Sequence, residues 1–153
     1  MHFCKVKSHK FLMFLKGFIW RASDKIFKFT IIIVMTPPSK INLNKAKTVL
    51  TVTFDDIDYE LTSEFLRVYS PSAEVVGHGP GQETLQVGKE NVAITSIQPT
   101  GNYAIVLFFS DGHDTGIYSW SHLYKLATNR DSLWNEYLKK LVDAGHSRNS
   151  KTN

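Results

Sequence analysis

The chain has 153 residues, which is enough for one folded domain but not for two. Hydrophobic residues make up 42% of it and charged residues 21%, a balance that fits a globular protein and excludes disorder throughout. The single cysteine, Cys4, excludes an internal disulfide and any multi-cysteine zinc or iron–sulphur site built by this chain alone.

The net charge of +4 is distributed unevenly along the chain. Residues 1–35 hold seven cations and one anion, a charge of +6, whereas residues 36–153 hold eleven cations and thirteen anions, a charge of −2. The part that is expected to fold is therefore mildly acidic. For this reason the basic isoelectric point does not indicate a nucleic-acid partner.

The first segment is rich in phenylalanine as well as in cations. Its longest uncharged run, residues 29–39, is shorter than the about 20 apolar residues that span a membrane, and cations interrupt the stretch that a secretory signal would need. We interpret residues 1–37 as a basic aromatic extension. Either the start codon is assigned too far upstream and translation really begins at Met35, or the extension is disordered. A basic helix on a membrane surface is the second interpretation and a targeting peptide the third. A cytoplasmic protein with no integral membrane span is expected.

The domain is predicted over residues 38–145. Alternating apolar residues over 50–54 predict a strand, and Tyr59 and Leu61 begin a return strand after a turn at 55–58, so a hairpin is expected. Helical spacing over 61–69 ends before Pro71. A glycine-rich loop at 77–82 precedes a second strand over 92–97. The unbroken apolar run at 103–109 predicts a central strand, with 115–118 pairing against it.

Two helices complete the predicted domain. One covers 121–126, and the other begins near Asp131 or Ser132 and ends at Gly145, before a polar tail over 146–153. Strands followed by helices predict an α+β fold with a small, mainly antiparallel sheet and two to three short helices. The predicted core comprises Leu50, Val52, Phe54, Phe65, Leu66, Ile94, Ile105, Leu107, Trp120, Trp134 and Leu138.

The sequence contains no complete catalytic motif. The glycine loop departs from the dinucleotide-binding fingerprint because Gln82 stands where a glycine is needed. Metalloprotease, nucleophile-elbow and facial iron motifs are also missing from the sequence. These absences favour a binding protein over an enzyme.

Two polar clusters remain as candidate sites. One joins Glu74 and His78 to the loop glycines, and the other is the turn at 111–114, in which His113 stands between two aspartates. Imidazole nitrogens and carboxylate oxygens are ligands of divalent metals. The alternative, which the residues alone favour, is an Asp-Gly turn with a solvated or hydrogen-bonded histidine.

Four stretches of the sequence resemble the DUF971 family, the small domain also found at the N-terminus of γ-butyrobetaine hydroxylase. They are LRVYSPSAEV at 66–75, GHGPGQ at 77–82, GNYA at 101–104 and DGHDTGIYSW at 111–120. The resemblance implies a small α+β domain. It also implies an association with 2-oxoglutarate-dependent oxygenases and with P-loop ATPases that handle iron–sulphur clusters.

The resemblance further implies where a metal would lie. The hydroxylase version binds a structural zinc through three cysteines and a histidine, and these positions fall here on Ser70, Ser72, Val75 and His113. Because three of the four ligands are missing, no thiolate zinc site is expected.

The same resemblance implies that residues 70–75 lie near His113. A site for iron or zinc would then use His78 and His113 as nitrogen ligands and Glu74 or Asp114 as the carboxylate. The expected function is a stand-alone, non-catalytic binding module, related to iron and linked to iron–sulphur or oxygenase systems through a protein partner. The alternatives are an accessory domain of a metal-dependent oxidoreductase and an adaptor with no metal.

Overall fold

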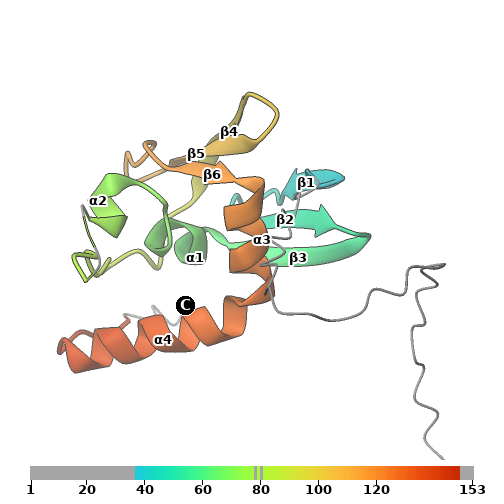
Figure 1. Ribbon diagram of the computed structural model, residues 1–153. Helices are drawn as coiled ribbons and strands as arrows, with labels where there is room; N and C mark the ends of the chain where they lie inside the picture. Colours follow the sequence, from blue (N-terminus) through green and yellow to red (C-terminus); the bar gives the residue numbers. More distant parts are fainter. Residues whose placement is uncertain (1–36, 78, 80, 149–153) are drawn as a thin grey trace, which may run out of the picture. The chain divides into compact units, whose positions relative to one another are not determined.

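The structure of the protein, a computed structural model, describes residues 37–77, 79 and 81–148 (Figure 1). The predictions made for residues 1–36 lie outside these residues. The elements in chain order are β1 Lys40–Leu43, β2 Val49–Phe54, β3 Ile57–Thr62, α1 Ser63–Val68, α2 Ala73–Val76, β4 Ile94–Thr100, β5 Ala104–Phe109, β6 Ile117–Ser119, α3 Trp120–Thr128 and α4 Arg130–Asp143.

The first sheet has the order β1-β2-β3, and both pairings are antiparallel. Strands β2 and β3 form the predicted hairpin. Its two-residue turn consists of Asp55 and Asp56, whose φ angles of 49° and 62° are those of the turn type that matches strand twist. Leu50 and Val52 point from β2 into the core and are fully buried.

The second sheet has the order β4-β5-β6 and is also antiparallel. The apolar run that predicted a central strand is β5, which pairs with a neighbour on each side, so this prediction is confirmed. The sheets meet where the N–H of Ile94 donates to the carbonyl of Lys47 at 2.8 Å.

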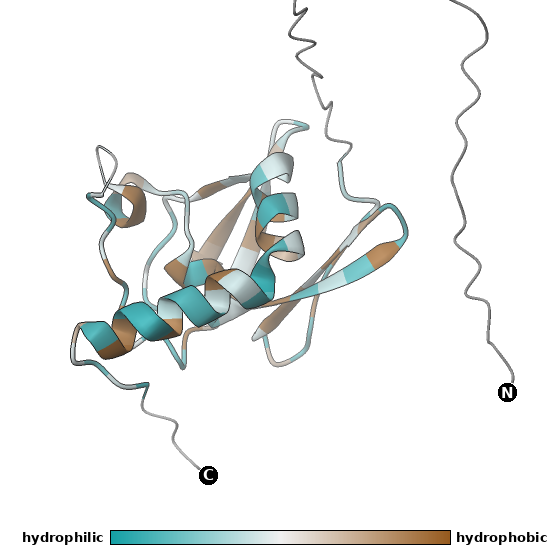
Figure 2. Cartoon of the chain, turned by 60° about the horizontal axis from the view of Figure 1, so that its bottom comes forward, coloured by the Kyte–Doolittle hydropathy of each residue, from teal (hydrophilic) through white to brown (hydrophobic). Residues whose placement is uncertain are grey.

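The helices follow the strands and are fixed by local capping. The Thr62 side chain caps α1 by accepting from the N–H of Phe65, and the Ser119 side chain caps α3 by accepting from the N–H of His122. Helix α3 contacts β3, β6 and α4. Much of the visible side of α4 is hydrophilic (Figure 2), while Tyr137 and Leu141 are buried on its other side.

The core contains most of the predicted residues. Trp120, Trp134 and Leu138 are only partly buried, whereas Tyr118, Leu123 and Leu126 belong to the core and were not predicted. The predicted core residues that are buried are Leu50, Val52, Phe54, Phe65, Leu66, Ile94, Ile105 and Leu107.

The α+β class and the antiparallel pairing are confirmed. The strands form two sheets instead of one, and the described residues contain four helices instead of two to three. Strand β1 and helix α2 were not predicted. Arg148, beyond the predicted boundary at 145, binds Glu64 through two hydrogen bonds of 2.9 and 2.6 Å. No helix in the described part of the chain is long and apolar enough to cross a membrane.

Candidate functional site

The segment that follows α1 meets the loop between β5 and β6 at a short hydrogen-bonded chain of three side chains. Ser70 Oγ lies 2.8 Å from His113 Nε2, and Glu74 Oε2 lies 3.2 Å from His113 Nδ1. In a neutral imidazole arranged in this way, Nδ1–H donates to the carboxylate and Nε2 accepts the serine O–H. The proximity of residues 70–75 to His113 is therefore confirmed.

His113 is buried, with 5% of its surface exposed. Burial, followed by the positive charge of Arg67, lowers the pKa of His113, although the hydrogen bond and the charge of Glu74 act in the opposite direction. The neutral form of the imidazole is therefore favoured. It is the form that accepts from Ser70 while donating to Glu74.

An ion-pair network holds the 110–116 loop from the other side. Asp111 Oδ2 lies 2.9 Å from Arg67 Nε and 2.7 Å from Lys89 Nζ. Burial acts to raise the pKa of Asp111, but the hydrogen bond from Lys89 and the two positive charges outweigh it, so the pKa lies below its usual value. Arg67 also donates to Gln86 Oε1 at 3.0 Å. The turn was predicted from the sequence, but its partners on α1 and in the 86–89 segment were not.

Gly116 allows the two segments to approach closely. A Cβ atom at this position would collide with Ser70 Oγ and lie 3.1 Å from the ring of Tyr118 and 3.4 Å from Pro71. The Tyr118 hydroxyl in turn donates to the carbonyl of Leu66 at 2.8 Å. Only glycine fits in this space without movement of its neighbours.

The predicted ligands come together only in part. Glu74 and His113 are in contact, whereas Asp114 is exposed and makes no hydrogen bond or ion pair with the described residues. His78 lies outside the described residues. Among residues 37–77, 79 and 81–148, no group of three or more histidine, cysteine, aspartate or glutamate side chains is placed to hold a metal ion.

The positions of the family's thiolate zinc site do not fit that metal here. The hydroxyl of Ser70 is engaged in a hydrogen bond with His113. The side chain of Val75 has no atom that could bind a metal ion. Ser72 Oγ is buried and has no hydrogen-bond partner among the described residues, but a serine hydroxyl is a poor zinc ligand beside a thiolate. These residue types do not make a thiolate site, and Ser70 and His113 are joined by a hydrogen bond instead.

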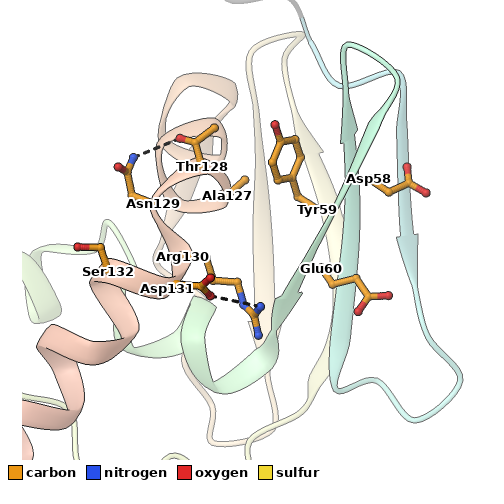
Figure 3. A pocket seen from close by; sticks show the side chains of 9 residues that line it. All are labelled: Asp58, Tyr59, Glu60, Ala127, Thr128, Asn129, Arg130, Asp131 and Ser132. Atoms are coloured by element: carbon orange, nitrogen blue, oxygen red, sulfur yellow. Dashed lines mark hydrogen bonds and ion pairs between the residues drawn. The ribbon is translucent and has the colours of Figure 1, made fainter. Parts of the chain in front are cut away.

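The described residues also line two hollows that no sequence pattern predicts, and the second of them borders the cluster at Ser70. One, of about 500 Å³, is lined by Asp58, Tyr59 and Glu60 of β3 and by residues 127–132, where α3 is followed by α4 (Figure 3). The other, of about 270 Å³, is lined mainly by apolar side chains, among them Val75 and Tyr137. Both are built from segments far apart in the sequence, so no local pattern reveals them.

Comparison with known proteins gives a family and similar structures. A sequence profile of the family described as gamma-butyrobetaine hydroxylase-like, N-terminal, matches residues 41–124. No curated protein matches the chain.

Among the solved structures that are similar to the chain, three are described here. An NMR solution structure is 49% identical, covers 78% of this chain and 94% of its own, and has a TM-score of 0.67. A second NMR solution structure is 46% identical, covers 78% of this chain and 89% of its own, and has a TM-score of 0.66. A crystal structure of a DUF971-family protein of unknown function from Acidithiobacillus ferrooxidans is 37% identical, covers 59% of this chain and 91% of its own, and has a TM-score of 0.48.

Proposed function

Because this chain belongs to the family of gamma-butyrobetaine hydroxylase-like N-terminal domains, we propose that it is a non-catalytic binding module that acts through a protein partner. The partner belongs to iron–sulphur or oxygenase systems in the cytoplasm. The associations of the family resemblance support this part of the proposal.

One observation carries the non-catalytic part. The Ser70–His113–Glu74 chain has the connectivity of a hydrolase triad, in which a histidine links a serine to a carboxylate. A nucleophile must, however, reach the substrate. Ser70 is 1% exposed, and Gly116 packs against its hydroxyl, so the atom that would attack is closed to a substrate carbonyl. The three hydrogen-bonded side chains therefore fit a structural role, in which both ring nitrogens of His113 are engaged in hydrogen bonds.

Two measurements test the proposal. A fluorophosphonate probe, which labels activated serines, should leave Ser70 unmodified when the intact protein is analysed by mass spectrometry. The second measurement is affinity capture from the native lysate. The tagged chain should recover a partner, and that partner, when it is tagged in turn, should recover this chain. An unrelated α+β domain of similar size serves as the control bait. Labelling of Ser70, or the lack of any reciprocal pair above the control, contradicts the proposal.

The contact between Glu74 and His113 favours a second candidate, the binding of an iron or zinc ion. The Glu74 side chain is 65% exposed and bonds to Nδ1, whereas Ser70 bonds to the other ring nitrogen, so an ion could replace the Glu74 hydrogen bond without disturbing Ser70. We place His78 and Asp114 as its further ligands.

Metal analysis after loading and desalting tests this candidate. The full chain should retain about one ion of zinc or Fe(II), and Glu74→Gln and His78→Ala should each lose it. Asp143→Asn, a carboxylate change on α4, should retain it and is the matched control. If the unmodified chain retains no metal, the metal-binding candidate is wrong and the protein is an adaptor that binds no metal.

A further inference from the structure

Strand β3 lies at the edge of its sheet, and its outer backbone groups have no partner among the described residues. In an antiparallel pair, alternate residues bond to the neighbouring strand. The N–H of Ser63 donates to the carbonyl of Thr48 at 2.8 Å, in register with the pairing of β2 and β3, so Leu61 and Tyr59 face β2 as well. The backbone groups of Asp58 and Glu60 consequently point away from the sheet. In the described part of the chain, no hydrogen bond outside the sheet engages them.

The hollow of about 500 Å³ lies beside the part of β3 that contains these groups (Figure 3). Its opposite wall is the corner between α3 and α4, residues 127–132. The Tyr59 side chain points toward this corner, whereas Asp58 and Glu60 point to the other face of the sheet. An exposed strand edge next to a hollow bounded by a helix is the arrangement in which extended peptides add to a sheet.

We propose that the free edge of β3 is a docking site for an extended, basic segment of a protein partner, which adds to the sheet as a strand beside β3. This inference rests on the proposed function, since it names the surface through which the module would bind its partner.

The chemistry of the occupant follows from strand alternation. Side chains of an added strand on one face lie beside Asp58 and Glu60, where lysine or arginine would form cross-strand ion pairs. Side chains on the other face enter the hollow, whose lining is mostly polar apart from Tyr59 and Ala127, so small side chains fit there. Among the described residues that line the hollow, Arg130 is the one cation, and it lies 3.7 Å from the Asp131 carboxylate. A peptide in which basic residues alternate with small residues is therefore the complementary partner.

A second copy of this chain is a poorer occupant. Antiparallel pairing of two β3 edges would bring Asp58 and Glu60 of one copy against the same carboxylates of the other. Like charges across a strand pair are destabilising, and charged edges are a device by which proteins avoid self-association. The carboxylates thus oppose self-pairing while favouring a basic segment.

Amide hydrogen exchange on the full chain tests the inference directly. The probe is a ten-residue peptide of alternating lysine and valine, added at about ten times its Kd. The amides of Asp58 and Glu60 should then exchange about tenfold more slowly, while those of Tyr59 and Leu61, already bonded to β2, should change little. A peptide N-methylated at alternate residues, on the edge that would face β3, keeps the charge but cannot form the ladder, and it should give no protection.

Charge variants complete the test. The double variant Asp58→Asn/Glu60→Gln keeps similar side-chain shapes and should bind the basic peptide about tenfold more weakly. The double variant Glu136→Gln/Asp143→Asn removes the same charge from α4 and should bind like the unmodified chain. Equal weakening in both variants, or binding without protection of Asp58 and Glu60, overturns the inference. Reciprocal capture of a partner that survives Asp58→Asn/Glu60→Gln would overturn the β3 site while the proposed function stands.

Discussion

The substitution Gly116→Ala should destabilise the domain by forcing the 70–76 segment away from the 110–116 loop. The backbone of Gly116 is not in the left-handed region, so the new methyl group acts by collision alone. It would overlap Ser70 Oγ and crowd Tyr118, which is fully buried. The neighbours must move, and the hydrogen bond from Ser70 to His113 is the first contact that this movement would break.

The magnitude follows from two contributions. Overpacking a close-packed site costs about 1–3 kcal/mol, and loss of a buried hydrogen bond adds about 1 kcal/mol, so Gly116→Ala should lower the free energy of unfolding by about 2–4 kcal/mol. Ser70→Ala alone should cost about 1–3 kcal/mol because it leaves a buried nitrogen of His113 without its partner. In the double variant the alanine methyl at 116 occupies space vacated by the hydroxyl. Its cost should therefore be smaller than the sum of the single costs by at least about 1 kcal/mol.

Urea unfolding followed by tryptophan fluorescence and circular dichroism measures all three variants. Gly112→Ala is the control, because Gly112 has a φ of +84° and open space around it, so its cost is backbone strain and should add to that of Ser70→Ala without coupling. If the Gly116 and Ser70 changes are also additive to within about 0.5 kcal/mol, the close packing described for this site is wrong.

Four further predictions concern the rest of the domain. Leu107→Ala, at a fully buried position of β5, should cost about 2–5 kcal/mol in urea unfolding, and a cost near zero would place that strand at the surface. Arg148→Ala should cost about 2 kcal/mol, because it leaves the buried carboxylate of Glu64 unpaired; Arg148→Lys should recover part of this loss. Burial lowers the pKa of His122, whose imidazole bonds to the Tyr69 carbonyl. The contribution of His122 to the free energy of unfolding is therefore present at pH 7 and declines as the pH falls below 6.5. In thermal melts of His122→Gln, this part of the pH dependence of the melting temperature should vanish. Incubation with a strong chelator should leave the melting temperature unchanged, and a large decrease would reveal a tightly held metal.

The sequence predicts those elements whose pattern is long and regular. The alternation of Leu50, Val52 and Phe54 identifies β2, and the apolar run up to Phe109 identifies β5, because burial on one face or on two leaves different periods. Strand β1 has four residues that are at most half-buried, and α2 is a single turn, so neither repeats long enough to show a period. The division into two sheets is not a local property either, since it depends on which strands pair across the chain.

At the candidate site, too, one part can be predicted from the sequence and another part cannot. The family resemblance brings residues 70–75 close to His113, and the structure agrees, but the partner it provides is a serine hydroxyl 43 residues away in the sequence. Nothing local in the sequence indicates that Arg67 would reach Asp111, 44 residues further along. Such contacts arise when α1 and the β5–β6 loop pack against each other, and periodicity carries no information about the choice of partner.

The contacts at this junction are themselves a source of stability for the 110–116 loop. In small metal-binding domains the ion itself supplies folding free energy. Here the two segments are joined by the hydrogen bond from Ser70 to His113 and by the one that His113 donates to Glu74. The ion pairs of Asp111 and the hydrogen bond from Tyr118 to α1 add to them. Each neutral bond contributes about 1 kcal/mol and each charged one about 1.5–3 kcal/mol. Their sum is large enough to fix the loop, so we expect the fold to be stable with Ser70, Ser72 and Val75 at these positions.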